Sequence, residues 1–129
     1  MKIEHLALNV PDATALAKWY VEHLGLVVRR SSSDEPWAHF LVDDSGQMML
    51  ELYTNKSVEI PDYASIPPEN LHLAFASDDP TADAKRLCAA GATMVVESEE
   101  APNGDAFAMV RDPWQIPVQF AKRTESLLD

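Results

Sequence analysis

Apolar and polar residues alternate at the start of the chain and then give way to a helical spacing. Residues 2–10 alternate and are rich in Leu, Ile and Val, a pattern that predicts a β-strand. After this strand, apolar residues recur at the spacing of an amphipathic helix, at Leu16, Trp19, Tyr20 and Leu24. Asp12 or Thr14 can cap the start of this helix, and Gly25 can end it. The chain therefore opens with a strand followed by a helix.

The remaining pattern predicts strands in both halves of the chain and one more helix. In the first half, strands are predicted at residues 26–32, 36–43 and 46–54. The second half predicts a strand at 70–77, a helix at about 80–90, and strands near 92–97, 105–111 and 115–121. The segment between the halves contains Pro61, Pro67 and Pro68 without clear periodicity, which is typical of a linker. Residues 124–129 are expected to be frayed or helical.

An internal repeat runs through this pattern. Residues 5–18 read HLALNVPDATALAK and residues 72–85 read HLAFASDDPTADAK, so that at least seven of the fourteen aligned pairs are identical. Chance matching at average composition gives about one identity. Each copy therefore predicts the same βαβββ module. We expect one domain with the following bounds: module one at about residues 1–54, a linker at 55–69 and module two at about 70–122, within residues 1–129.

Four polar side chains are predicted on equivalent faces of these strands. Alternation along a strand places His5, Glu51, His72 and Gln119 opposite the largest apolar neighbours. The spacing within each half also matches, since 51 − 5 = 46 and 119 − 72 = 47. Two imidazoles, a carboxylate and an amide oxygen suit a divalent metal such as Zn, Ni, Co, Mn or Fe(II). The alternative is four independent polar strand residues, and the matching spacings favour the metal site.

Composition and charge limit the classes of partner. The net charge of −11, from 21 acidic and 10 basic residues, disfavours binding to nucleic acid or to anionic membrane lipid. The chain contains no apolar run of the roughly 20 residues that a membrane helix needs. A single cysteine, Cys88, excludes an internal disulfide and suits a reducing compartment. Because the first residues also lack an apolar signal segment, we expect a cytoplasmic protein.

Several motifs resemble those of the vicinal oxygen chelate superfamily, which includes glyoxalase I, extradiol dioxygenases and the fosfomycin and bleomycin resistance proteins. The resemblance covers about residues 2–122. Its motifs are the histidine strands IEHLAL and LHLAF, the helix end WYVEHLGL, the LEL strand around Glu51 and the segment RDPWQIPVQF before and around Gln119. The resemblance implies an α+β fold in which paired βαβββ modules form a curved mixed sheet around a metal-binding cleft.

The resemblance also implies a function. It makes His5, Glu51, His72 and Gln119 the ligands of one divalent metal ion. It further implies a glyoxalase-like lyase or isomerase that acts on a small vicinal-oxygen substrate through an enolate-type intermediate. Glu51 is then the catalytic base, because a glutamine at position 119 cannot accept the proton. The alternatives are a non-catalytic small-molecule binding or resistance protein of the bleomycin-resistance type, and a family member that has lost its activity.

The sequence departs from true glutathione-dependent glyoxalase I. Glutathione-binding members carry an arginine where Asn9 stands and a lysine where Asn103-Gly104 stands, and only Asn55 matches a glutathione contact. Without these basic residues the carboxylates of glutathione lose their partners. Extradiol dioxygenases and fosfomycin resistance proteins carry a glutamate where Gln119 stands. These departures argue against glutathione-dependent glyoxalase I activity, extradiol dioxygenase activity and fosfomycin resistance activity.

Further residues are candidates for lining a substrate pocket for a small-molecule ligand: Asn9, Trp37, His39, Tyr53, Asn55, Phe107 and Trp114. Core packing is the alternative for Phe107, and a structural role is the alternative for His39, which could otherwise act as an acid–base residue. Trp114 occupies a turn and could close the pocket or pack across a dimer. Trp19, Tyr20 and Trp114 in so small a chain favour a homodimer.

Overall fold

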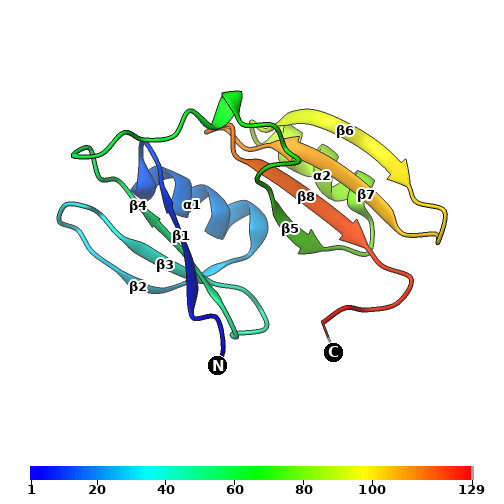
Figure 1. Cartoon of the computed structure of the whole chain (residues 1–129), viewed down its shortest axis with the longest axis horizontal. Helices are drawn as coiled ribbons and strands as arrows, with labels where there is room; N and C mark the ends of the chain where they lie inside the picture. The colour runs from blue at the N-terminus through cyan, green and yellow to red at the C-terminus, as the bar shows by residue number, and fades with distance from the viewer. Residues whose placement is uncertain (129) are drawn as a thin grey trace. The chain divides into compact units, whose positions relative to one another are not determined.

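The computed structural model describes residues 1–128, and Asp129, at the end of the segment predicted to be frayed or helical, lies outside the described residues. The chain divides into two compact units, of which the first comprises Met1–Pro61 and the second begins at Asp62. This boundary falls within the linker predicted at residues 55–69. Each unit contains one four-stranded sheet and one α-helix (Figure 1).

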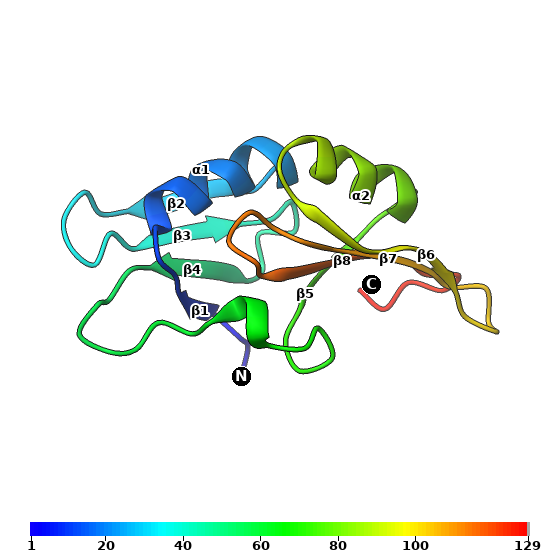
Figure 2. The same cartoon turned by 90° about the horizontal axis from the view of Figure 1, so that it is seen from above.

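In the first unit the helix follows the first strand, as the sequence predicts. Its elements are β1 (His5–Asn9), α1 (Ala13–Leu24), β2 (Val27–Ser31), β3 (His39–Val42) and β4 (Met49–Tyr53). The strand order is β1-β4-β3-β2, with β1 parallel to β4 and the other pairs antiparallel. The helix covers one face of this sheet (Figure 2) and buries Leu16 and Tyr20.

The second unit repeats this arrangement. Its elements are a 3₁₀ helix η1 (Tyr63–Ser65), β5 (Leu73–Ala76), α2 (Pro80–Ala89), β6 (Thr93–Glu100), β7 (Ala106–Arg111) and β8 (Pro117–Lys122). The strand order is β5-β8-β7-β6, and again only the first pair is parallel. The two mixed sheets with their two helices confirm the predicted α+β fold of paired βαβββ modules.

Equivalent residues start the two α-helices. The Asp12 carboxylate accepts a hydrogen bond from the Ala15 amide at 3.0 Å, and the Asp79 carboxylate accepts one from the Ala82 amide at 3.0 Å. Each carboxylate satisfies a backbone amide that has no partner within the helix. Gly25 ends α1 in the left-handed conformation, with φ = 71°. The caps predicted for the first helix are therefore confirmed at Asp12 and Gly25.

The core of each unit lies between its helix and one face of its sheet. Large apolar side chains from alternate strand positions are fully buried there, among them Leu41, Leu52, Val110 and Val118. This alternation leaves the opposite face of each sheet to polar and smaller residues. Burial of each large apolar side chain contributes roughly 1.5 to 3 kcal/mol to the stability of the folded unit, and these contributions together form its main stabilising term.

Some element bounds differ from those predicted. The strand expected from residue 36 begins at His39, because the Pro36 carbonyl accepts a hydrogen bond from the Thr54 amide and Trp37 adopts φ = 53°. The linker is not featureless, since it contains η1 with Tyr63 buried. The strand that follows α2, β6, extends to Glu100, whereas its predicted end is near residue 97. Residues 124–128 contain no helix.

Within residues 1–128, every helix is too short or too polar to span a lipid bilayer.

Candidate functional site

His5 and Glu51 lie together on one face of the first sheet. The parallel pairing of β1 with β4 sets Ala7 opposite Glu51, so that His5 lies two residues before the partner of Glu51 and on the same face. The Nε2 atom of His5 is 3.4 Å from the Oε2 atom of Glu51. The side chains of His5 and Glu51 are 35% and 19% exposed, so a small ligand can reach both.

The other ring nitrogen of His5 is also engaged. Its Nδ1 atom lies 2.5 Å from Oε2 of Glu4, and a carboxylate oxygen accepts a hydrogen bond only from a protonated nitrogen. With the proton on Nδ1, the lone pair of Nε2 faces Glu51. Two donors at this separation can bind one cation between them. A carboxylate on the far nitrogen is the usual support of a metal-binding histidine.

Phe40 holds the imidazole of His5 from the side. Its ring lies 5.7 Å from the ring of His5 at an interplanar angle of 86°, an edge-on contact. Phe40 pairs directly with Glu51 across β3 and β4, so the three side chains share one face. The geometry of the His5–Glu51 pair therefore rests on three strands of the sheet.

In the second unit, His72 and Gln119 occupy the equivalent positions of the repeat, but β5 begins only at Leu73, so His72 lies just before the strand and outside its pairing with β8. The pairing of β5 with β8 sets Ala74 opposite Gln119, and His72 lies two residues before Ala74. The Nδ1 atom of His72 is 2.7 Å from the Pro68 carbonyl oxygen, which accepts its proton and leaves Nε2 available. The side-chain amide of Gln119 forms no hydrogen bond within residues 1–128. Each unit thus offers one imidazole nitrogen and one side-chain oxygen.

The structure brings together part of the predicted ligand set. His5 and Glu51 are in contact within the first unit, whereas His72 and Gln119 belong to the second. Over the described residues 1–128, no three His, Cys, Asp or Glu side chains are grouped closely enough to hold a metal ion. The available donors, imidazole nitrogen with carboxylate or amide oxygen, do fit a divalent cation of the Zn or Fe(II) type.

The two asparagines predicted to line the pocket bind each other. The Asn9 side chain donates to the Asn55 carbonyl at 2.9 Å and accepts from the Asn55 amide at 2.8 Å. The Asn55 side chain accepts from the amide and hydroxyl of Ser57. These contacts fix the segment after β4 to β1. Tyr53 pairs with Asn9 and lies on the same face as Glu51.

His39 lies on the opposite face of the sheet. His39 pairs with Leu52, whose side chain is fully buried, so the side chain of His39 points to the helix-covered face and away from Glu51. Its Nδ1 atom lies 2.6 Å from the Trp37 carbonyl oxygen in the preceding loop. The structure thus supplies a local structural partner for His39.

In the second unit, Phe107 lies on the face of Gln119, because it pairs with Ala121, two residues further along β8. The guanidinium of Arg123 lies over its ring, 4.9 Å from the centroid. Trp114 is half-buried in the turn between β7 and β8, where its amide donates to the Asp112 carboxylate at 2.8 Å.

One polar cluster escaped the sequence analysis. Asp105, which is buried, accepts hydrogen bonds from the Thr124 amide at 2.9 Å and from Arg123 Nη1 at 2.8 Å. The Thr124 amide, and next the Arg123 guanidinium, hold the pKa of Asp105 well below its usual range. The repeat contains a signal for Arg123, which follows Gln119 by four residues (123 − 119 = 4) as Asn55 follows Glu51 (55 − 51 = 4).

Solved structures with this fold are numerous. SMU.1112c is 26% identical to the chain, with a TM-score of 0.72, covering 94% of this chain and 98% of its own. A glyoxalase-related enzyme from Fulvimarina pelagi is 18% identical, with a TM-score of 0.73 and coverage of 95% and 88%. TnmS3, an antibiotic binding protein from Streptomyces sp. CB03234, is 19% identical, with a TM-score of 0.69 and coverage of 96% and 97%.

The sequence itself matches a family model, although no curated protein sequence is significantly similar to it. The model is that of the Glyoxalase/Bleomycin resistance protein/Dioxygenase superfamily, and it matches residues 2–120, nearly the whole chain. This match agrees with the paired βαβββ modules and with the repeated histidine strands. The chain therefore belongs to the Glyoxalase/Bleomycin resistance protein/Dioxygenase superfamily.

Proposed function

We propose that the protein is a divalent-metal-dependent lyase or isomerase that acts on a small molecule with vicinal oxygen atoms. The observation that carries this proposal is the 3.4 Å approach of His5 Nε2 to Glu51 Oε2, with Glu4 bound to the far side of the imidazole. The equivalent positions of His72 and Gln119 in the sequence repeat support it.

The metal ligands in this proposal are His5, Glu51, His72 and Gln119. When bound, the metal supplies a Lewis acid that stabilises negative charge developing on a substrate oxygen. The Pro68 carbonyl on His72 and the Glu4 carboxylate on His5 fix the ring tautomers that such binding needs.

Glu51 moves the proton in this proposal. It is the one carboxylate among the four residues, and its side chain is still 19% exposed, which leaves it open to a substrate C–H bond. Gln119 has no basic oxygen of comparable strength and serves only to bind and orient. Phe40 limits the movement of the neighbouring imidazole and helps to exclude water from that side.

The experiment combines metal content with turnover. The purified chain is stripped with chelator, reloaded with Zn, Ni, Co, Mn or Fe(II), and assayed for hemithioacetal isomerisation and for epimerisation of thioesters that carry a C–H stereocentre at C2. We expect activity only in the loaded protein and its loss in His5→Ala. His23→Ala is the matched control, because His23 lies on α1 against Trp19, outside the proposed set. Stoichiometric metal in His5→Ala contradicts the proposed site.

A second candidate is non-catalytic binding of a small molecule. Two observations favour it: the second unit contains a cavity of about 590 Å³, and the fold is similar to that of TnmS3, an antibiotic binding protein. A protein that binds a ligand equally well with and without metal, and turns over none of the tested substrates, supports this candidate over the enzyme.

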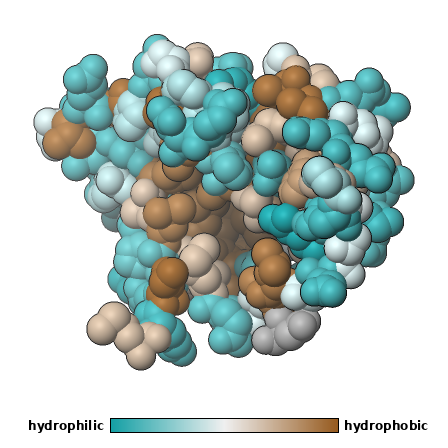
Figure 3. Space-filling view, turned by 45° about the vertical axis from the view of Figure 1, so that its right-hand side comes forward, coloured by the Kyte–Doolittle hydropathy of each residue, from teal (hydrophilic) through white to brown (hydrophobic). Residues whose placement is uncertain are grey.

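We further propose a homodimer. Each sheet ends in two edge strands, and exposed apolar side chains include Leu6, Val27, Val28 and Val95. Figure 3 shows hydrophobic side chains at the surface among hydrophilic ones. Pairing between copies covers such edges and side chains. Sedimentation velocity at micromolar concentration tests the proposal, and a single monomeric species contradicts it.

A further inference from the structure

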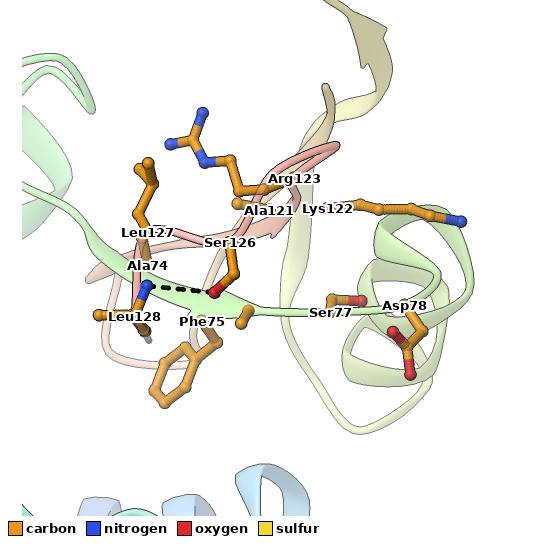
Figure 4. A pocket seen from close by; sticks show the side chains of 11 residues that line it. Ala74, Phe75, Ser77, Asp78, Ala121, Lys122, Arg123, Ser126, Leu127 and Leu128 are labelled. Carbon is orange, nitrogen blue, oxygen red and sulfur yellow. Dashed lines mark hydrogen bonds between the residues drawn. The ribbon is translucent and has the colours of Figure 1, made fainter. Parts of the chain in front are cut away.

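The second unit contains a cavity that the proposed metal chemistry does not use. Its volume is about 590 Å³, within the range of small-molecule sites. It lies along the edge strand β5, the end of β8 and the segment that follows β8 (Figure 4). Its lining residues are 74–78, 121–123 and 126–128.

The walls of this cavity are mostly apolar. Ala74, Phe75 and Ala121 come from the two parallel strands, and Leu127 and Leu128 come from the segment after β8. Leu127 is 74% exposed and Leu128 86% exposed, which is unusual for two adjacent leucines. The Leu128 amide donates to the Ser126 hydroxyl at 3.1 Å, and Figure 4 places both leucines beside Ala74. An apolar ligand in the cavity would cover these leucines.

One end of the cavity carries a fixed cation. Arg123 Nη1 is bound to Asp105 at 2.8 Å and the guanidinium lies over the ring of Phe107, so the side chain is held in place from two sides. Its Nε and Nη2 atoms form no hydrogen bond within residues 1–128. A guanidinium held in this way binds a planar oxyanion with little further loss of side-chain entropy.

The charges around the cavity differ from those of the chain as a whole. The chain has a net charge of −11 and only 10 basic residues, yet Lys122 and Arg123 line this cavity together with Asp78, and Arg123 is paired with Asp105. In Figure 4, Lys122 and Asp78 lie at one end, and Arg123 lies at the other with Leu127. The end that carries Arg123 therefore combines a cation with apolar side chains.

The internal repeat gives this arginine a defined position. Arg123 follows Gln119 by four residues, as Asn55 follows Glu51 (123 − 119 = 55 − 51 = 4). In the first unit the Asn55 side chain is occupied by Ser57, whereas in the second unit two guanidinium donors stay available. Only the second module therefore has a charged hydrogen-bond donor, Arg123, directly after the strand that carries its proposed metal ligand, Gln119.

We propose that this cavity binds a small organic anion, with a carboxylate or sulfonate on Arg123 and an apolar body against Ala74 and Ala121. Leu127 and Leu128 close over the apolar body. This binding goes beyond the proposed metal-dependent reaction and needs no metal ion, so it is tested on metal-free protein and its outcome is separate from that of the reaction.

The test uses two dyes that differ in charge. The probe 8-anilinonaphthalene-1-sulfonate has an aromatic body and a sulfonate, and N-phenyl-1-naphthylamine has the same body without the charge. Both are titrated by fluorescence against the metal-free chain. Arg123→Met is expected to lower the affinity for the sulfonate dye by about tenfold or more and to leave the affinity for the neutral dye unchanged. Only the sulfonate dye loses a charge-assisted hydrogen bond in this variant. Arg30→Met, on β2 of the first unit, is the matched control and keeps both affinities.

A second variant keeps the test decisive if loss of Arg123 unfolds the cluster around Asp105. Ala74→Phe fills the cavity from an exposed position and is expected to abolish binding of both dyes without changing the circular dichroism spectrum. Deletion of residues 126–129 is expected to lower the affinity for both dyes. Sulfonate-dye binding that is unchanged in both Ala74→Phe and Arg123→Met overturns the proposal, as does an equal loss of the two dyes in a folded Arg123→Met protein.

Discussion

The Nε2 atom of His5 faces the carboxylate of Glu51 at 3.4 Å while its Nδ1 atom faces the carboxylate of Glu4. One imidazole therefore lies between two carboxylates that come from the first and the fourth strand region of the same unit. The Glu4 carboxylate fixes the tautomer of the ring, and the Nε2 atom together with the Glu51 carboxylate offers two donors to a cation.

The first prediction concerns metal content. His5→Ala and His72→Ala should each remove bound metal, whereas Gln119→Ala should only weaken binding, because a neutral amide is a poorer ligand than an imidazole. The measurement is metal content by mass spectrometry after gel filtration, with His23→Ala as the control. Full metal content in both His5→Ala and His72→Ala would show that the metal site lies elsewhere.

The second prediction separates metal binding from proton transfer. Glu51→Gln should retain part of the metal but lose turnover by at least about a hundredfold, the usual contribution of a general base. Glu59→Gln, in the loop after β4, is the matched control and should keep full activity. Gln119→Glu should preserve activity or extend it to the mirror-image substrate face. Turnover at full rate in Glu51→Gln assigns the base to another residue.

The third prediction uses the backbone of the β7–β8 turn. Gln115 adopts φ = 74°, a left-handed conformation that costs most residues about 1 to 2 kcal/mol and glycine almost nothing. Gln115→Gly should therefore stabilise the protein by roughly 0.5 to 1 kcal/mol after the entropy that glycine loses on folding. Urea unfolding measures the change. Gln47→Gly, in the β3–β4 turn, should not stabilise the protein, since Gln47 has no positive φ.

The fourth prediction concerns Arg111, which ties the linker to the second sheet. Its Nη1 atom donates to the Tyr63 and Gln115 carbonyl oxygens and its Nη2 atom to that of Ile66, all at 2.9 Å. Lysine cannot reproduce this planar fork, so Arg111→Lys should lower the free energy of unfolding by about 1 to 3 kcal/mol. Arg86→Lys, at an exposed position of α2, should change it by less than about 0.5 kcal/mol. Equal unfolding midpoints for the two variants would contradict this role.

The fifth prediction concerns acid stability. Hydrogen bonds from Thr124 and Arg123 lower the pKa of Asp105 in the folded protein, so its carboxylate contributes stability above the pKa of the unfolded state. That contribution should be lost progressively as the pH falls below about 4, the ordinary pKa of aspartate, toward the lower folded value. Asp105→Asn should be less stable at pH 7 and show a flatter dependence between about pH 5 and pH 2. Asp44→Asn, in the exposed β3–β4 turn, should keep the wild-type slope.

Alternation and repetition were sufficient to predict the elements and the pairing of His5 with Glu51. The period of two in a strand fixes the face of each residue, and the matching spacings of 46 and 47 residues fix which strands correspond. Strand ends were less predictable, because the segment around Trp37 is set by contacts with Thr54 and not by its own pattern.

Contacts between distant residues left no signal in the pattern. Arg111 binds carbonyl oxygens 45 and 48 residues away, and any linker sequence supplies such oxygens. Asp105 with Arg123 reads in the sequence as two ordinary surface charges. The orientation of His39 follows from its pairing with Leu52, which depends on the length of the β3–β4 turn. These features arise from tertiary packing and need the structure.

The parallel pairing of β1 with β4, and of β5 with β8, joins the first strand of each module to its last. A donor pair such as His5 with Glu51 therefore exists only after a loop of more than forty residues has closed, the slowest kind of contact for a short chain to make. A metal ion bound by these donors would show that the whole module is folded. A module truncated before β4 cannot present the pair, so binding at His5 and Glu51 depends on the folded module.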